Sequence, residues 1–212
     1  MDFIIRAATI NDIEALVELH MASLRSEDHI PVMLGRNYVV ATYHWLLTSE
    51  ISYLLMAESE GILAGLIAVC DSAFTKPMFT ACLDEFFKSI IRTPPLLFKR
   101  KLWERLLRHS EKSTLATKFV NYPGVAQMTI GAVSKDFRGY GVFPSLIKET
   151  KFYSKNRGCR AIRAGMYKSN RSVRRAFEKA GWYEAPIFET EDTQFFIAYL
   201  DSDIEQELSQ LI

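Results

Sequence analysis

One segment constrains the fold more than any other: an apolar run that passes through two glycines into a helix. Residues 128–133 are apolar and β-prone, Gly139 and Gly141 follow, and residues 144–150 have a helical pattern. A strand that enters a helix through such a turn directs several backbone N–H groups, and the positive end of the helix dipole, at one point. The segment therefore predicts an anion site, most often for phosphate, at this turn.

Two familiar phosphate-binding motifs are excluded. The sequence has no Gly-Lys-Ser or Gly-Lys-Thr, so it has no triphosphate P-loop. The dinucleotide fingerprint requires a third glycine, but Val142, Phe143 and Pro144 follow the pair here. Pro144 suits the first turn of a helix, where its missing N–H is harmless.

The segment resembles the acyl-CoA-binding loop of the GNAT superfamily of acetyltransferases, whose pattern is Gln/Arg-x-x-Gly-x-Gly/Ala. Arg138 and Gly141 match this pattern, whereas Phe143 replaces the small last residue. The resemblance implies that backbone amides of the loop bind the pyrophosphate of acetyl-CoA. The implied loop residues are Arg138, Gly139, Tyr140, Gly141, Val142 and Phe143.

A second block, residues 170–182, is similar to the downstream Asn-x(6)-Tyr-Glu-Lys-x-Gly-Phe block of the same superfamily. Asn170 matches, Phe177 stands in place of Tyr, and Trp182 stands in place of Phe. The resemblance implies that Asn170 and Phe177 lie against the cofactor, and Asn170 also suits a helix N-cap. It covers residues 125–200 well and residues 1–70 weakly.

The hydrophobic pattern predicts elements in the order β-α-α-β-β-β-α-β-α-β, which agrees with the GNAT arrangement. The expected strands are 3–7, 53–58, 62–69, 125–133, 161–166 and 193–200; the expected helices are 10–24, 38–47, 144–157 and 169–180. Thr9 is the expected N-cap of the first helix, and Gly158 and Gly181 end the last two. The fold class is thus α/β, with a mixed, mostly antiparallel central sheet flanked by helices.

Residues 72–123 exceed the turn that the family commonly has between its third and fourth strands. We expect one domain over residues 1–212 that contains a helical insert at 72–123, with helices at 86–91 and 96–109. Residues 86–118 carry nine Lys or Arg against two Glu, a net charge of +7. Since the whole chain is +1, the rest is 1 − 7 = −6.

Three interpretations of this insert stay open. It is an amphipathic helical pair packed on the domain or in a homodimer, a basic wall beside the acceptor site, or a surface for an anionic membrane. The basic wall would suit a phosphorylated or nucleotide-linked substrate. Nucleic acid is not an expected partner, because no recognition motif accompanies the charge.

The bulk properties favour a cytoplasmic protein. No signal peptide is recognisable, and no apolar run approaches the about 20 residues of a membrane span. The three cysteines, Cys70, Cys82 and Cys159, have no metal-binding spacing, so we expect no metal and buried thiols in a reducing compartment.

The resemblance implies acetyl-CoA as donor and an amine as acceptor. The pantetheine arm would follow the strand that ends at Val133, where Gly131 indicates a bulge or a close ligand approach. The N–H groups near Ala132 and Val133 would stabilise the developing oxyanion, and one such donor is worth about 3–4 kcal/mol. The amine attacks directly, so Cys159 is not expected to act as a nucleophile.

The general acid and base are less defined. Phe177 replaces the usual Tyr acid, and CoA thiol leaves unaided or receives its proton from Tyr167. His20 is the first candidate base, on a helix and with a pKa suited to the role. Glu58, Asp71 and a water relay are the alternatives. Beside the cofactor, a cation from the set Arg174, Arg175 and Lys179 is available for its 3′-phosphate.

We therefore expect an acetyltransferase that acts on the primary amine of a small molecule. The first two helices and the basic insert loosely resemble acetyltransferases of bacterial surface-polysaccharide pathways, which implies a nucleotide-linked amino sugar as acceptor. The alternatives are a protein, peptide or drug-like amine, or a non-catalytic acyl-CoA-binding module.

Overall fold

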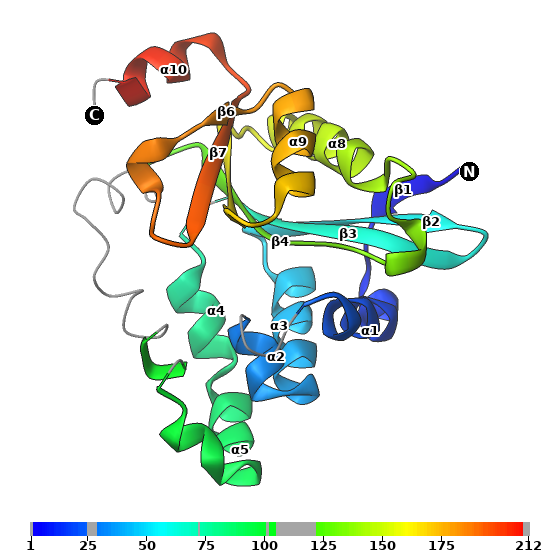
Figure 1. Cartoon of the computed structure of the whole chain (residues 1–212), viewed down its shortest axis with the longest axis vertical. Helices are drawn as coiled ribbons and strands as arrows, with labels where there is room; N and C mark the ends of the chain where they lie inside the picture. The colour runs from blue at the N-terminus through cyan, green and yellow to red at the C-terminus, as the bar shows by residue number, and fades with distance from the viewer. Residues whose placement is uncertain (1, 25–28, 72, 101, 105–121, 210–212) are drawn as a thin grey trace.

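A computed structural model describes the chain except for residues 1, 25–28, 72, 101, 105–121 and 210–212 (Figure 1). Its centre is a seven-stranded sheet in the order β1-β2-β3-β4-β5-β7-β6. Only the pair β4–β5 is parallel, and the other neighbours are antiparallel. The strands are β1 Ile4–Ala7, β2 Ser52–Ser59, β3 Ile62–Cys70, β4 Val125–Val133, β5 Ala161–Tyr167, β6 Tyr183–Glu184 and β7 Thr193–Tyr199.

Helices cover both faces of the sheet (Figure 1). On one face lie α1 Ile13–Ser23, α2 Ile30–Leu34 and α3 Arg36–Thr48; on the other lie α8 Val142–Asn156 and α9 Arg171–Lys179. The remaining helices are α4 Thr75–Ala81, α5 Leu83–Arg92, α10 Ser202–Ser209 and the 3₁₀ turns η1 Ile10–Asp12, η2 Pro94–Phe98, η3 Lys135–Phe137 and η4 Pro186–Phe188. Because β2 and β3 are covered on both faces, their side chains form nearly continuous buried runs.

This arrangement confirms the expected mixed, mostly antiparallel sheet flanked by helices. The short elements α2, α4, β6 and α10 were not predicted, since segments of two to eight residues carry little periodicity. No helix in the described part of the chain has both the length and the apolar character that a membrane span requires.

The helical insert differs in part from the prediction. An unpredicted helix, α4, comes first, and α5, which corresponds to the predicted helix 86–91, is longer than predicted. The predicted helix 96–109 is wrong at its start, because Pro94–Phe98 forms a 3₁₀ turn instead; residues 105–109 lie outside the described residues. The insert packs through Phe86, Leu96 and Leu102 against α2 and α3.

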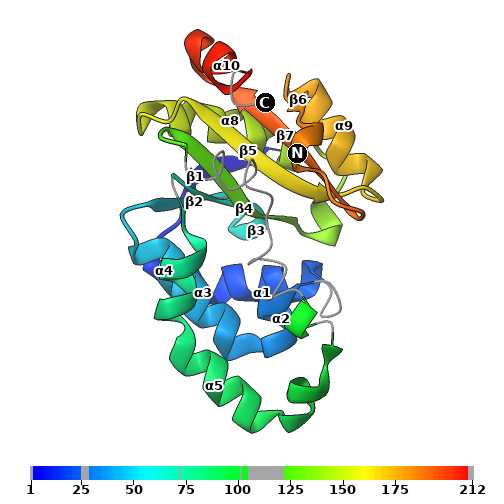
Figure 2. The ribbon, with the colours of Figure 1, turned by 90° about the vertical axis from the view of Figure 1, so that its left-hand side faces the viewer.

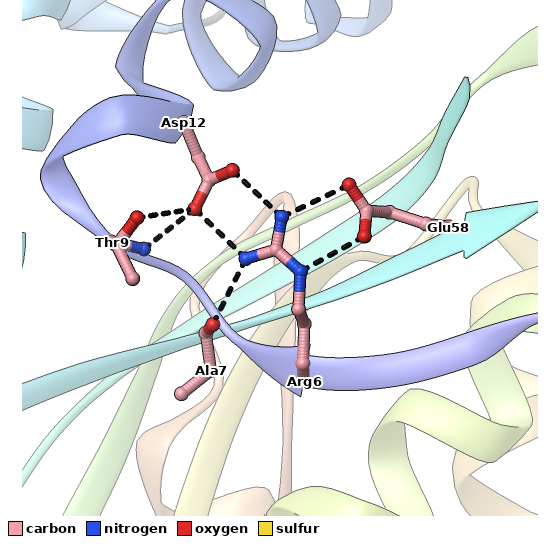
Figure 3. Close-up of polar contacts among 5 residues, drawn as sticks. All are labelled: Arg6, Ala7, Thr9, Asp12 and Glu58. Carbon is pink, nitrogen blue, oxygen red and sulfur yellow. Dashed lines mark hydrogen bonds and ion pairs between the residues drawn. The ribbon is translucent and has the colours of Figure 1, made fainter. Parts of the chain in front are cut away.

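A network of charged side chains joins the edge strand β1 to β2 and to the turn before α1 (Figure 3). Arg6 donates to the Asp12 carboxylate at 2.7 and 2.9 Å and to the Glu58 carboxylate at 2.9 and 3.0 Å. Asp12 also accepts from the backbone N–H of Thr9 at 2.7 Å, which forms the N-terminal cap expected at Thr9. The hydrogen bonds from Arg6 hold the pKa of Asp12 well below its usual range. The network joins β1, β2 and the turn before α1.

Removal of this guanidinium should destabilise the fold. Hydrogen bonds to charged groups contribute about 1.5–3 kcal/mol when buried. Since the Arg6 side chain is 37% exposed, we expect Arg6→Met to lower the free energy of unfolding by about 1–2 kcal/mol in urea titrations. Arg36→Met is the matched control, because Arg36 joins the more exposed Glu14 and Glu18. Equal losses in both variants would contradict the assignment.

Candidate functional site

The glycine turn presents unpaired backbone N–H groups at the start of a long helix. Gly139 and Gly141 have φ of 87° and 83°, the left-handed region that favours glycine. A β carbon at either position would meet nothing within 4 Å, so the backbone conformation, not space, requires glycine. Among the hydrogen bonds of the described residues, none uses the N–H groups of residues 139–143. Such N–H groups, together with the positive end of the α8 dipole, would favour a bound anion at this turn.

A basic groove adjoins the turn. It has a volume of about 420 Å³ and is lined by Pro144, Lys148, Lys151, Lys179 and Ala180. Lys151 donates to the Ala180 carbonyl at 3.2 Å, which ties α8 to the end of α9. Sequence reasoning named Lys179 but missed the two α8 lysines; their signal is the spacing 144, 148, 151, which places one helix face toward the groove.

Two further candidate residues, on α9 and at its N-terminus, have partners within the chain. Arg174 contacts the carboxylates of Glu178 and Glu184, so its charge is already compensated. Asn170 is the N-cap of α9, as expected, and its side chain accepts from Val173 N at 3.3 Å. Its predicted contact with a ligand stays a prediction.

The sheet opens between β4 and β5, beside the turn. The two strands pair only over Val125–Met128 and Ala161–Ala164, after which β4 continues along β3 and β5 along β7 (Figure 2). The register shift between β3 and β4 leaves Thr129 as an extra residue, a β-bulge. Beyond the bulge, β4 has an edge toward the opening that β5 does not pair, and Ala132 and Val133 lie on it.

Gly131 was expected to mark either a bulge or a close ligand approach, and the bulge lies elsewhere on β4. Gly131 lies two residues beyond Thr129 and serves close packing instead. A β carbon on Gly131 would lie 3.0 Å from Cε2 of Phe143, so the Phe143 ring occupies the space beside the strand. The family's small residue at position 143 is thus replaced by a ring that a strand glycine accommodates.

Phe177 belongs to an aromatic cluster behind this opening. It is 1% exposed, and its ring centroid lies 4.8 Å from Trp182, 5.2 Å from Phe196 and 6.0 Å from Phe143. The side chain has no proton to donate, so its direct role is packing. Through Phe143 it supports the wall of the opening.

The structure places His20 away from solvent, contrary to the expectation that it faces a cleft. It is fully buried on α1, with Nδ1 2.9 Å from the Tyr43 hydroxyl and Nε2 3.2 Å from Nδ1 of His29. Burial, and then the charge of His29, lower the pKa of His20 to about 3. An imidazole that resists protonation this strongly is a poor general base near neutral pH.

The other candidate acids and bases differ in accessibility. Tyr167 is 41% exposed at the end of β5, past the last residue that pairs with β4. Glu58 is bound by Arg6, and Asp71 accepts from Nε of Arg157 at 2.7 Å. Burial raises the pKa of Cys159 to about 12, so its thiol stays protonated. Among these candidates Tyr167 has the most exposed side chain, and its role as an acid stays a prediction.

A buried cation on β5 was missed by sequence reasoning. Arg163 donates to the Gln127 side chain, and its guanidinium lies 5.2 and 5.3 Å from the ring centroids of Phe188 and Phe195. Burial lowers the pKa of Arg163 to about 10. Since its strand neighbours Ile162 and Ala164 face α8 and α9, Arg163 faces the opposite side of the sheet.

Comparison with known proteins identifies the fold. No protein-family model and no curated protein sequence matches the chain. Among solved structures, PaiA N-acetyltransferase from Thermoplasma acidophilum in complex with coenzyme A has a TM-score of 0.60 and 12% identity, covering 94% of this chain and 99% of that one. The ribosomal-protein-S18-alanine N-acetyltransferase from Escherichia coli has 0.56 and 10%, covering 94% and 95%.

A third similar structure is described as a GNAT domain. The GNAT domain of PAT from S. lividans has a TM-score of 0.58 and 14% identity, covering 92% of this chain and 89% of that one. The fold of this chain is therefore that of the GNAT N-acetyltransferases. The polysaccharide-pathway likeness finds no support among these structures.

Burial of His20 makes stability depend on pH. The unfolded chain holds this imidazole at its ordinary pKa near 6.5, whereas the folded chain holds it at about 3. Between these values the unfolded state binds more protons, so the free energy of unfolding falls as pH falls, by about 3 kcal/mol from pH 7 to pH 4. We expect urea titrations from pH 7 to pH 4 to show this loss.

The variant His20→Gln should have a shallower dependence on pH than the wild type, whatever its absolute stability. His44→Gln is the control, since His44 is exposed on α3. If His20→Gln and the wild type lose stability in parallel, the buried neutral imidazole is not the cause.

Proposed function

We propose that this chain is an acyl-CoA-dependent N-acetyltransferase that moves an acetyl group from acetyl-CoA to a primary amine. The observation that carries the proposal is the continuity of three features: the N–H groups of residues 139–143, the lysine-lined groove and the opening between β4 and β5. The pyrophosphate, the 3′-phosphate and the pantetheine arm of acetyl-CoA would each contact one of these features. The fold shared with a coenzyme A complex supports this arrangement.

In this proposal each part of the cofactor has a partner. The pyrophosphate binds the turn, where backbone amides and the helix dipole favour negative charge. The 3′-phosphate lies among Lys148, Lys151 and Lys179, the cations that line the groove. The pantetheine arm follows the β4 edge beyond Thr129 in place of a neighbouring strand.

The transfer then needs little covalent help from the protein. A backbone N–H near Ala132 and Val133 polarises the thioester carbonyl and stabilises the oxyanion. The neutral amine forms the new C–N bond, the C–S bond breaks, and the thiolate leaves with a proton from Tyr167 or water. The burial of His20 favours a water relay as the route by which the acceptor loses its proton.

The acceptor is proposed only as an amine. A nucleotide-linked amino sugar stays a prediction, and a protein or peptide amine is its rival, since one similar structure is a ribosomal-protein-alanine N-acetyltransferase. Release of CoA thiol in the presence of an amino-sugar nucleotide, a peptide amine or a small amine separates them. We also propose one domain over residues 1–212 and, because its three cysteines are unbridged, a reducing compartment such as the cytoplasm.

A second function is favoured by one observation, the absence of a hydroxyl at Phe177. A chain that binds acyl-CoA without turnover would keep the turn and the groove but need no acid. Thiol release with any of the amines contradicts this alternative. Tight acetyl-CoA binding without thiol release supports it.

The turn offers the sharpest test of cofactor binding. Gly141→Asp places a carboxylate where the pyrophosphate belongs, so we expect acetyl-CoA affinity to fall at least about tenfold by calorimetry. Gly61→Asp is matched, because Gly61 also has a positive φ of 77° and open space around it but lies in the β2–β3 turn. Unchanged affinity in a folded Gly141→Asp protein would remove the central claim.

Substitutions of Phe177 distinguish a role in packing from a role in the chemistry. Phe177→Ala should cost about 3–5 kcal/mol of stability, as expected for a buried aromatic side chain. Phe196→Ala, which removes the ring stacked on it, should cost a similar amount. Phe177→Tyr should leave turnover within a few-fold of wild type or raise it. A large loss of turnover in a stable, CoA-binding Phe177→Tyr protein would show that residue 177 is wrongly aligned with the family's acid.

A further inference from the structure

Exposed hydrophobic side chains are concentrated on the insert. Of the twelve large hydrophobic side chains exposed among the described residues, five lie within positions 87–103. Phe98 and Ile91 are the two most exposed of the twelve, at 87% and 76%. We name this set the apolar tip; its members are Phe87, Ile91, Leu97, Phe98 and Trp103. Such concentration on one segment marks an interaction surface.

The apolar tip is separate from the insert's own core. Phe86 and Ser89 are buried, and Phe86 packs with Leu96 and Leu102 against α2 and α3. Phe87 and Ile91 are four residues apart on α5, so they share an outer stripe of that helix. The insert therefore has exposed apolar side chains that take no part in its packing against α2 and α3.

Cations accompany the apolar tip. Lys88 and Arg92 lie on α5 with it, and Lys99 and Arg100 directly follow Phe98. Some contact acids of the same insert, Lys88 and Arg92 at Glu85 and Arg100 at Glu104, but these ion pairs are exposed and therefore weak. The net charge of +7 over residues 86–118, against −6 elsewhere in the sequence, favours contact of this stretch with an anionic surface.

The position of α5 suits contact with a flat partner. In both views α5 lies at the end of the long axis, with α2 and α3 between it and the sheet (Figures 1 and 2). The helices α8 and α9, which carry the groove, lie beyond the sheet from it. A surface that holds α5 would leave the glycine turn open to solvent.

We propose that the apolar tip docks on the surface of a membrane that contains anionic lipids. Aromatic and aliphatic side chains enter the boundary between headgroups and acyl chains, while neighbouring Lys and Arg meet lipid phosphates and carboxylates. The same cations would be a poor match for a purely apolar protein face. The inference is independent of the proposed catalysis, because no residue of the turn, the groove or the opening takes part.

The test is cosedimentation of the full chain with vesicles. Wild-type protein should bind vesicles of phosphatidylcholine mixed with phosphatidylserine, bind those of phosphatidylcholine alone weakly, and release as salt rises. Ile91→Ser/Phe98→Ser should lower partitioning at least about tenfold, because it removes the two most exposed apolar side chains. Ile62→Ser/Phe152→Ser, which removes two exposed apolar side chains elsewhere, should bind as wild type does.

Lys99→Glu/Arg100→Glu should abolish the preference for phosphatidylserine while acetyl-CoA affinity stays unchanged. Failure of the wild type to bind anionic vesicles, or equal binding by the Ile91→Ser/Phe98→Ser variant, overturns the proposal. If sedimentation velocity shows a wild-type dimer that this variant dissociates, and vesicles bind neither, the apolar tip is instead an interface between two copies of the chain.

Discussion

The bulge at Thr129 is the constraint on which the candidate site depends. A single extra residue ends the register between β4 and β5 after Met128 and separates two strands that would otherwise continue side by side. An uninterrupted parallel pair would satisfy the β4 backbone internally and leave no edge for an extended ligand. The glycine turn follows the same strand, so the unpaired edge of β4 leads directly to the turn before α8.

Near the bulge, the fold accommodates an aromatic ring at Phe143. Phe143 stands where the family pattern has a small residue, and Gly131 is the strand position that makes room for it. The ring then contacts Phe177, which in turn contacts Trp182 and Phe196. The departures at positions 143 and 177 therefore lie in one contact chain. The two positions that differ from the resembled pattern are thus joined by one aromatic cluster.

The sequence predicts much of the fold because its long elements are regular. The apolar pattern of residues 125–133 predicts both ends of β4 correctly. Gly158 and Gly181 follow the ends of their helices and have positive φ, as expected of glycine caps. Gly131 was expected to mark a bulge or a close ligand approach, but it lies against the Phe143 ring, because a glycine in a strand does not reveal what approaches it. The burial of His20 was missed because its partners, Tyr43 and His29, are distant in sequence or in another element.

The two glycines of the turn have a consequence that concerns handedness. Positive φ with nothing nearby means that an L side chain at Gly139 or Gly141 is strained by its chirality, and not by its volume. A D-residue would adopt the same backbone without that strain and would also restrict the unfolded chain, so it would stabilise the turn. Chemical synthesis with D-alanine at these positions would therefore keep the backbone conformation of the turn, whereas L-alanine would strain it.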